Sequence, residues 1–307
     1  MELVAKSISA LGTSIEIKLP IANSALFPLC FGEISRIEDQ FSRFKDSSEL
    51  SKLNRNLGKW QTASEEMLYL LSKALDFFSK TDGNFDITLK SALDNLGYDK
   101  DYSFKVKDGM ESLPLPPIQQ LSSSPIEPNK PPSILIDSNN SIVFLNKEID
   151  FGGFGKGSAL DKASALLERN GGFHYYINAG GDIKSRKSKD GEPWTIILEH
   201  PDDPEMAIGT IELNNQSLAA SAPNRRKWGD GLHHLLNAKT HLPAMDVKAI
   251  FIVAKTGIES DAYATALFTA GFEEAISLSK TLPVEMLIVS SQNKMFKSDG
   301  FDAKLFK

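Results

Sequence analysis

The chain has little cysteine, no long hydrophobic run and no excess of basic residues. Its one cysteine, Cys30, excludes a disulfide framework within the chain and a cysteine-rich metal site, and we expect it in the core. No segment approaches the roughly 20 apolar residues of a membrane-spanning helix. The net charge of −6 at pH 7 argues against a nucleic-acid-binding surface. Residues 1–19 alternate like a strand and form no export leader, so we expect a cytoplasmic protein.

Hydrophobic residues make up 41% of the 307 residues, which is enough for a large core. Apolar residues three and four apart predict helices over 24–44 and 65–80, the second with a capping box at Thr62 and Glu65. A further helix is expected to be capped by Ser260 and to end at Gly271. Residues 42–54 and 217–245 are expected to be irregular. Alternating apolar residues predict strands over 9–19, 134–137, 142–145, 175–177, 194–198, 208–213, 249–254 and 284–290.

Residues 101–133 differ in composition from the rest of the chain. Seven of the 15 prolines lie here, interleaved with three consecutive serines. Such a segment is poorly suited to a packed core, because proline and serine bury little apolar surface. We therefore predict a flexible insertion or linker at 101–133.

A glycine-rich run, Gly152–Ser158, lies between an expected strand ending at Ile149–Phe151 and a helix that continues to Gly171. Bare N–H groups at the start of a helix can bind an anion such as phosphate. A tight strand-to-helix turn that needs glycine explains the run equally well. Neither named phosphate motif fits, because Gly157 separates Lys156 from Ser158 and the third glycine comes one residue early for a dinucleotide fingerprint. The run predicts either a phosphate site or a plain turn.

Two other glycine-containing segments carry polar side chains. Asn178–Asp182 places a second glycine pair after an expected strand, between an amide and a carboxylate. Asn84–Asp86 places an aromatic residue beside an acid, just after the glycine that ends a helix. The second segment is consistent with a pocket wall and with an ordinary loop that has a buried anchor.

Asp261 and Thr265 are four residues apart and lie on one face of a predicted helix. Two hard oxygen donors in this arrangement can share a magnesium ion, which takes few protein ligands and completes its octahedron with phosphate and water. Helix-dipole stabilisation explains Asp261 without any metal. Both interpretations stay open at this level.

The adjacent histidines His233 and His234 cannot point the same way on a strand. We expect one of them to face a site and the other to face solvent. Histidines are more often ordinary surface or core groups than catalysts. The five histidines of the chain lie at spacings that predict no zinc cluster.

Taken in order, these segments resemble the ApbE family of flavin transferases. The main motifs are DFGGFGKGSALD at 150–161, NAGGD at 178–182 and DAYATA at 261–266. Further matches are Gly12-Thr13, residues 42–54, GNFD at 83–86, Leu96–Tyr98, and Ser221 with Arg225-Arg226 before His234. Together the motifs cover nearly the whole chain apart from residues 101–133.

The resemblance implies one α+β domain, residues 1–307, with two lobes of mixed sheets and helices similar to a T-fold. Members of the family transfer FMN from FAD, with magnesium, to a Ser or Thr hydroxyl of an acceptor protein and release AMP. By position, the resemblance implies that Mg²⁺ would be held by Asp261, Thr265 and the carbonyl of Gly155. It implies two catalytic residues, His234, which would assist deprotonation of the acceptor hydroxyl, and Asp261. The residues that would contact FAD are Leu11, Phe44, Asn84, Phe85, Asp86, Gly152, Ser158 and Leu236.

The chain departs from the family pattern near the expected acceptor and flavin sites. After the histidine, the family usually has Asp-Pro, a variable residue and Thr-Gly, whereas Asn237–His241 keeps only the threonine. Phe44 replaces the usual tyrosine, and Leu11 replaces the usual methionine. Two alternatives to transfer therefore remain: hydrolysis of FAD to FMN and AMP, and FAD binding without catalysis.

Overall fold

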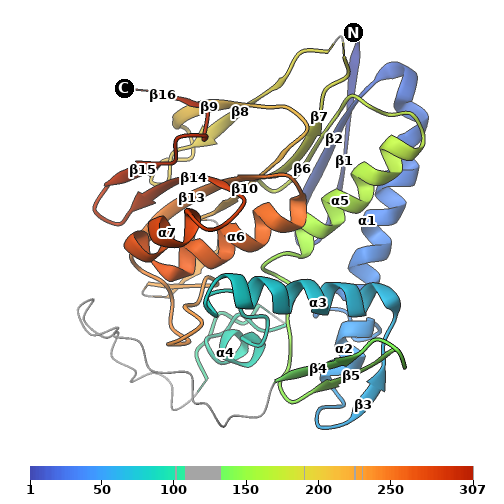
Figure 1. Ribbon diagram of the computed structural model, residues 1–307, viewed down its shortest axis with the longest axis vertical. Helices are drawn as coiled ribbons and strands as arrows, with labels where there is room; N and C mark the ends of the chain where they lie inside the picture. Colours follow the sequence, from blue (N-terminus) through green and yellow to red (C-terminus); the bar gives the residue numbers. More distant parts are fainter. Residues whose placement is uncertain (101, 108–132, 190, 225, 230, 307) are drawn as a thin grey trace.

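The computed structural model describes residues 1–100, 102–107, 133–189, 191–224, 226–229 and 231–306. The predicted insertion at 101–133 therefore lies largely outside the described residues, and its boundaries stay a prediction. Helices and sheets are mixed within one domain, as the α+β prediction requires (Figure 1). Among the described residues, no helix combines the length and the apolar character needed to cross a membrane.

The centre of the described fold is an eight-stranded sheet in which every strand is antiparallel to its neighbours. Its first two strands form a hairpin whose turn residues, Leu11 and Gly12, both have positive φ, as a two-residue turn of this twist requires. In spatial order the strands are β1 (Leu3–Ala10), β2 (Thr13–Pro20), β6 (Tyr175–Ala179), β7 (Asp182–Arg186), β10 (Ser217–Ser221), β13 (Val247–Ala254), β14 (Glu285–Ser290) and β15 (Met295–Lys297).

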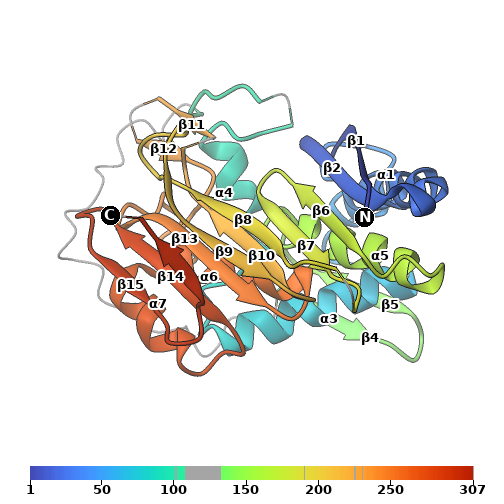
Figure 2. The same cartoon turned by 90° about the horizontal axis from the view of Figure 1, so that it is seen from above.

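Three helices, α1 (Phe27–Phe41), α5 (Gly155–Arg169) and α6 (Gly257–Ala270), cover one face of this sheet (Figures 1 and 2). The apolar residues of α1 recur at helical spacing, and Pro28 suits the first turn because its missing N–H would have no partner there. One core cluster joins α1 and α5 to β2 and β6, and it includes Cys30, which is fully buried as predicted. The remaining helices on this side are the 3₁₀ turn η1 (Ile21–Leu26) and α7 (Phe272–Ser279).

The opposite face of the sheet packs against a smaller three-stranded sheet of β8 (Trp194–Glu199), β9 (Ala207–Leu213) and β16 (Ala303–Leu305) (Figure 2). Alternate residues of both sheets point into the space between them, and Leu198, Leu213 and Leu287 are fully buried there. A two-stranded ribbon, β11 (Lys227–Trp228) and β12 (Leu232–His233), lies in the connection between β10 and β13.

A second lobe is built around helix α3 (Glu65–Lys80), which runs beneath α5 and α6 in Figure 1. It includes α2 (Glu49–Asn54), α4 (Lys90–Asn95) and a sheet of β3 (Trp60–Thr62), β5 (Ile142–Leu145) and β4 (Ile134–Asp137). The largest core cluster is continuous from α3 to α6 and β13, so the two lobes share one core.

Two expectations for the second lobe are wrong in detail. The end of the segment 42–54 is helical, because Ser48 caps α2 and Leu50 and Leu53 are buried. Helix α3 has the predicted bounds, but its cap is Ser64, whose side chain accepts a hydrogen bond from the N–H of Met67. Met67 is three positions after Ser64, which is the same spacing as that between Thr62 and Glu65 in the predicted capping box.

Three further expectations are corrected near the glycine-rich run. No strand leads into it, because Ile149 pairs with the side chain of Asn54 through two hydrogen bonds of 2.8 Å instead of with a strand. Within the stretch expected to be irregular, Ser217–Ser221 forms β10 in the central sheet. Helix α6 is capped by Thr256, through a full capping box with Glu259, and Ser260 lies inside the helix.

Candidate functional site

A cavity of about 620 Å³ lies where the two lobes meet. The β1–β2 turn, the end of α1, the glycine-rich run and the start of α6 all contribute to its lining. Ten of the residues assigned through the family resemblance line it: Leu11, Phe44, Phe85, Asp86, Gly152, Gly155, His234, Leu236, Asp261 and Thr265.

The other two assigned residues, Asn84 and Ser158, do not line the cavity. Asn84 is 2% exposed, and its amide group donates to the carbonyl of Thr81 and to Glu274. Ser158 is buried on the face of α5 that packs into the fold. Their assigned contacts with FAD stay predictions, and in this structure both side chains are buried outside the cavity lining.

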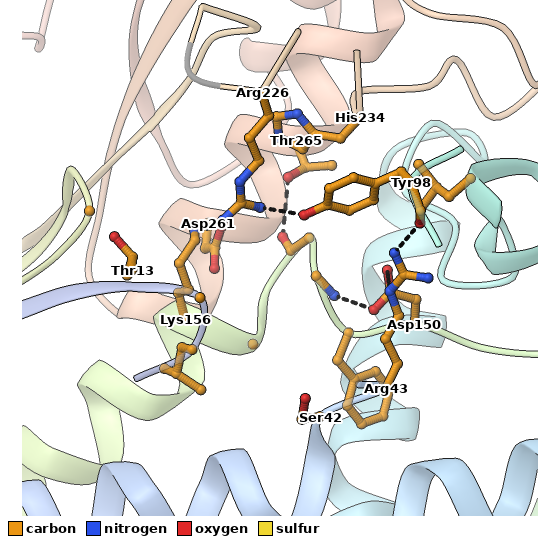
Figure 3. A pocket seen from close by; sticks show the side chains of 18 of the residues that line it. Thr13, Ser42, Arg43, Tyr98, Asp150, Lys156, Arg226, His234, Asp261 and Thr265 are labelled. Carbon is orange, nitrogen blue, oxygen red and sulfur yellow. Dashed lines mark hydrogen bonds and ion pairs between the residues drawn. The ribbon is translucent and has the colours of Figure 1, made fainter. Parts of the chain in front are cut away.

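The glycine-rich run holds its shape through side chains on both sides. Asp150 accepts a hydrogen bond from the N–H of Gly152 (3.0 Å), and the hydroxyl of Thr265 donates to the carbonyl of Gly153 (3.2 Å), as Figure 3 shows. Helix α5 begins at Gly155, so the second half of the run forms the first turn of the helix. The run therefore makes the expected turn and also lines the cavity, while its use as a phosphate site stays a prediction.

Helices α5 and α6 cross at two glycines. A Cβ atom added to Gly157 would lie 2.0 Å from the carbonyl oxygen of Gly257, and one added to Gly257 would lie 2.4 Å from that of Gly157. Only glycine permits this approach. The contact brings the N–H of Gly157 to 2.9 Å from Asp261 Oδ2, which fixes the carboxylate at the floor of the cavity.

Two carboxylates converge on the ammonium group of Lys156. Asp182 forms an ion pair with it, and Asp261 Oδ1 lies 3.3 Å from Nζ. Burial opposes the charge of Lys156, but the two carboxylates outweigh burial and raise its pKa. Burial also raises the pKa of Asp182 to about 6, and the nearby charge of Asp261 adds to this effect.

The oxygen donors of this cluster suit a hard cation. The position between Asp182 and Asp261 already stabilises a positive charge, and the Thr265 hydroxyl lies one helical turn from Asp261. Within the part of the chain that the structure describes, no three His, Cys, Asp or Glu side chains form a metal centre. Such a donor set fits magnesium, which uses few protein ligands and takes the rest from phosphate and water.

His234 lines the cavity, and His233 lies behind it. Burial lowers the pKa of His234 to about 3, and Arg226 contributes to the decrease, so the imidazole is neutral at pH 7. Its Nδ1 atom has no hydrogen-bond partner among the described residues. The expectation that the other histidine faces solvent is wrong, because His233 is 2% exposed and both its ring nitrogens are hydrogen-bonded to backbone groups of Ala244 and Leu235.

Replacing His233 with glutamine is expected to reduce the acid sensitivity of the fold. Burial lowers the pKa of His233 from 6.5 to about 4, so the unfolded chain binds a proton between these values and the native state does not. The contribution of neutral His233 to the free energy of unfolding is fully present above pH 6.5. It decreases by about 2 kcal/mol on going from pH 7 to 5. Urea denaturation of the wild type and of His233→Gln at pH 7 and pH 5 measures this difference in the free energy of unfolding. An equal loss of stability in both proteins between these pH values would contradict the lowered pKa of His233.

An aromatic and cationic wall lies opposite the carboxylate cluster (Figure 3). Arg43 stacks on the ring of Phe44 at 4.5 Å, and it pairs with Asp94 and with Asp150. Arg226 donates a 2.9 Å hydrogen bond to the hydroxyl of Tyr98. Such a wall can hold a planar aromatic ring, because guanidinium groups and aromatic rings both stack on ring faces.

Several residues of the site have no role predicted from the sequence: Arg43, Tyr98, Tyr102, Lys156 and Asp182. The position of Asp182 directly after a glycine pair is a usable signal, because that pair ends a turn beside the cavity. Arg43 carries no such signal, since its partners are 51 and 107 residues away in the chain and only the fold brings them together.

The altered segment after His234 forms a compact turn. The side-chain oxygen of Asn237 accepts hydrogen bonds from the N–H groups of Lys239 and Thr240, both at 3.0 Å. An aspartate at this position would accept the same bonds. The departure from the usual family sequence therefore preserves the backbone beside Leu236.

One cavity thus joins an aromatic wall to a floor where two carboxylates hold the Lys156 ammonium. The chain belongs to the ApbE family, whose model matches residues 11–288. The FAD:protein FMN transferase of Salmonella typhimurium is 25% identical over 270 residues, covering 84% of this chain and 74% of the relative. That of Haemophilus influenzae is 26% identical over 285 residues, covering 88% and 80%.

Solved structures agree with the family assignment. The ApbE protein of Thermotoga maritima is 26% identical, with a TM-score of 0.82 over 98% of both chains. The flavin transferase ApbE of Vibrio cholerae is 22% identical, with a TM-score of 0.79 over 98% of both chains, and this likeness concerns the fold. The family resemblance and the α+β fold predicted from the sequence are both confirmed.

Proposed function

We propose that this chain transfers FMN from FAD to a Ser or Thr hydroxyl of an acceptor protein, with magnesium, and releases AMP. One observation supports this proposal most. The aromatic and cationic wall that contains Phe44 and the cluster of Asp182, Lys156 and Asp261 line the same cavity. The family membership and the names of the relatives support the same activity.

In this proposal the two ends of the cavity bind the two ends of the FMN half. The ring stacks at Phe44, and the diphosphate lies toward Lys156 and the glycine-rich run. The N–H groups at the start of α5 and the Lys156 ammonium favour negative charge there. Asp261, Thr265 and the carbonyl of Gly155 are the residues that would hold magnesium, which would supply positive charge to neutralise the diphosphate.

The proposed reaction exchanges one phosphorus–oxygen bond for another. The acceptor hydroxyl oxygen forms a bond to the phosphorus of the FMN half, and the bond from that phosphorus to the AMP phosphate oxygen breaks. The hydroxyl proton passes to Nδ1 of His234, which has no other hydrogen-bond partner among the described residues. AMP leaves with the electron pair of the broken bond.

Incubation with FAD, magnesium and candidate acceptor proteins tests the proposal. The expected result is AMP together with a fluorescent acceptor band that survives denaturing electrophoresis. AMP without a labelled protein would support hydrolysis of FAD instead. Tight FAD binding with no AMP at any magnesium concentration would support a binding protein without catalysis.

A further inference from the structure

Tyr102 reaches the cavity from the start of the predicted insertion. Residues 102–107 are described, and Tyr102 lines the cavity beside Phe44. Its N–H donates to the carbonyl of Asp99 (3.1 Å), and Phe104 is held against Gly97 in the same way (2.9 Å). The Tyr102 hydroxyl would lie 3.9 Å from a Cβ atom added to Gly12, so the side chain extends from Phe44 to the β1–β2 turn.

The Phe44 ring has two close neighbours, Arg43 and Tyr102. The guanidinium of Arg43 lies 4.5 Å from its centroid, and the ring of Tyr102 stacks on it at 5.0 Å with an interplanar angle of 16°. A third ring between Phe44 and Tyr102 would need a separation of about 7 Å between their planes, so a ligand ring cannot stack on this side of Phe44 while Tyr102 stays in place.

The two neighbours of Phe44 differ in how firmly they are held. Arg43 is 3% exposed in its side chain and is bound to Asp94, to Asp150 and to the carbonyl of Tyr98. Moving it would leave buried charges unpaired. Tyr102 is 41% exposed, and its backbone has a φ of 49°, which is unfavourable for tyrosine. Tyr102 is therefore the neighbour that can be displaced.

We propose that Tyr102 occupies the stacking position of the flavin ring on Phe44 and competes with the ligand for it. This inference rests on the proposed function, because it takes the ligand to be a flavin. When the flavin ring stacks on Phe44, the Tyr102 ring moves toward solvent, and the lost Phe44–Tyr102 contact lowers the apparent affinity.

A competing side chain lowers the apparent affinity for every flavin by the same factor. The fraction of molecules with Tyr102 displaced is a property of the protein, and each apparent Kd is the intrinsic Kd divided by that fraction. An aromatic pair of this kind corresponds to a factor of about 3 to 10. A residue that instead contacted only the phosphate or the adenosine part of the ligand would change the affinities for riboflavin, FMN and FAD unequally.

Titration of riboflavin, FMN and FAD, followed by flavin fluorescence, tests the inference on the full chain. Tyr102→Ala is expected to bind all three about 3- to 10-fold more tightly, by the same factor. Tyr102→Phe keeps the ring and should match the wild type. Tyr69→Ala is the matched control, because Tyr69 is a similarly exposed tyrosine on α3 that does not line this cavity.

The outcomes separate this inference from the proposed function. Unchanged or weaker binding by Tyr102→Ala, with AMP release from FAD intact, would overturn the role of Tyr102 alone. Unequal factors for the three flavins would also overturn it, since they indicate direct contact with the ligand. If neither the wild type nor Tyr102→Ala binds any flavin, the proposed function fails and this inference fails with it.

Discussion

Asp261→Asn is expected to lower the rate of AMP release from FAD by at least about 100-fold. Asparagine keeps an oxygen that can accept the hydrogen bond from Gly157, so the crossing of α5 and α6 is retained. The change removes the charge that faces Lys156 and, in the proposed function, a magnesium ligand. The measurement is the initial rate of AMP formation over a series of magnesium concentrations, and the residual rate should be insensitive to magnesium.

The matched control for this variant is Asp76→Asn on α3. Asp76 is exposed and pairs with Lys80 on the helix surface, so its removal should leave the rate within about twofold, as is usual for exposed ion pairs. Asp261→Asn should retain the circular dichroism spectrum of the wild type. Turnover within threefold of the wild type, with an unchanged magnesium requirement, would exclude Asp261 from the cation site.

Gly157→Ala is expected to lower the free energy of unfolding by about 3 kcal/mol, because its Cβ atom would overlap the backbone of α6. The two helices would have to separate, which moves Asp261 away from Lys156 and from the N–H of Gly157. For a chain of this size the melting temperature should fall by about 5 °C. Thermal unfolding and AMP release should both report the change, since the crossing also builds the cavity floor.

Gly32→Ala provides the opposite expectation with the same chemical change. Gly32 lies within α1, and a Cβ atom there would meet nothing within 4 Å. Alanine in a helix interior is favoured over glycine by up to about 1 kcal/mol, so this variant should be slightly more stable than the wild type. A Gly157→Ala protein as stable as Gly32→Ala would show that the helices can separate at no cost.

The elements that the sequence predicts well are those with long and regular apolar spacing. Helix α3 has the predicted bounds, and the hairpin β4–β5 is found where alternation places it. Helix α2 is missed altogether because its six residues give too short a pattern, and its two buried leucines matter only once α1 packs beside it. Strand β10 is missed because serines and alanines carry no strong strand preference.

The candidate site was predictable where family motifs mark it, and less so where packing builds it. The motifs lead to Asp261, Thr265 and His234, which all line one cavity. They also lead to Asn84 and Ser158, which lie behind the wall, because a motif marks a segment and cannot say which side chain of it points inward. The stacking of Tyr102 on Phe44 has no sequence signal, because only the fold brings these two residues together.

The crossing of Gly157 and Gly257 also bears on the order in which this protein can assemble. Gly157 and Asp261 are 104 positions apart in the chain. Closing so long a loop has an entropic cost, which is offset only when the core shared by the two lobes has formed. In a partly folded chain, Asp261 would therefore not yet lie beside Lys156 and Asp182. Exchange of the Gly157 amide hydrogen should accordingly require the same opening as global unfolding.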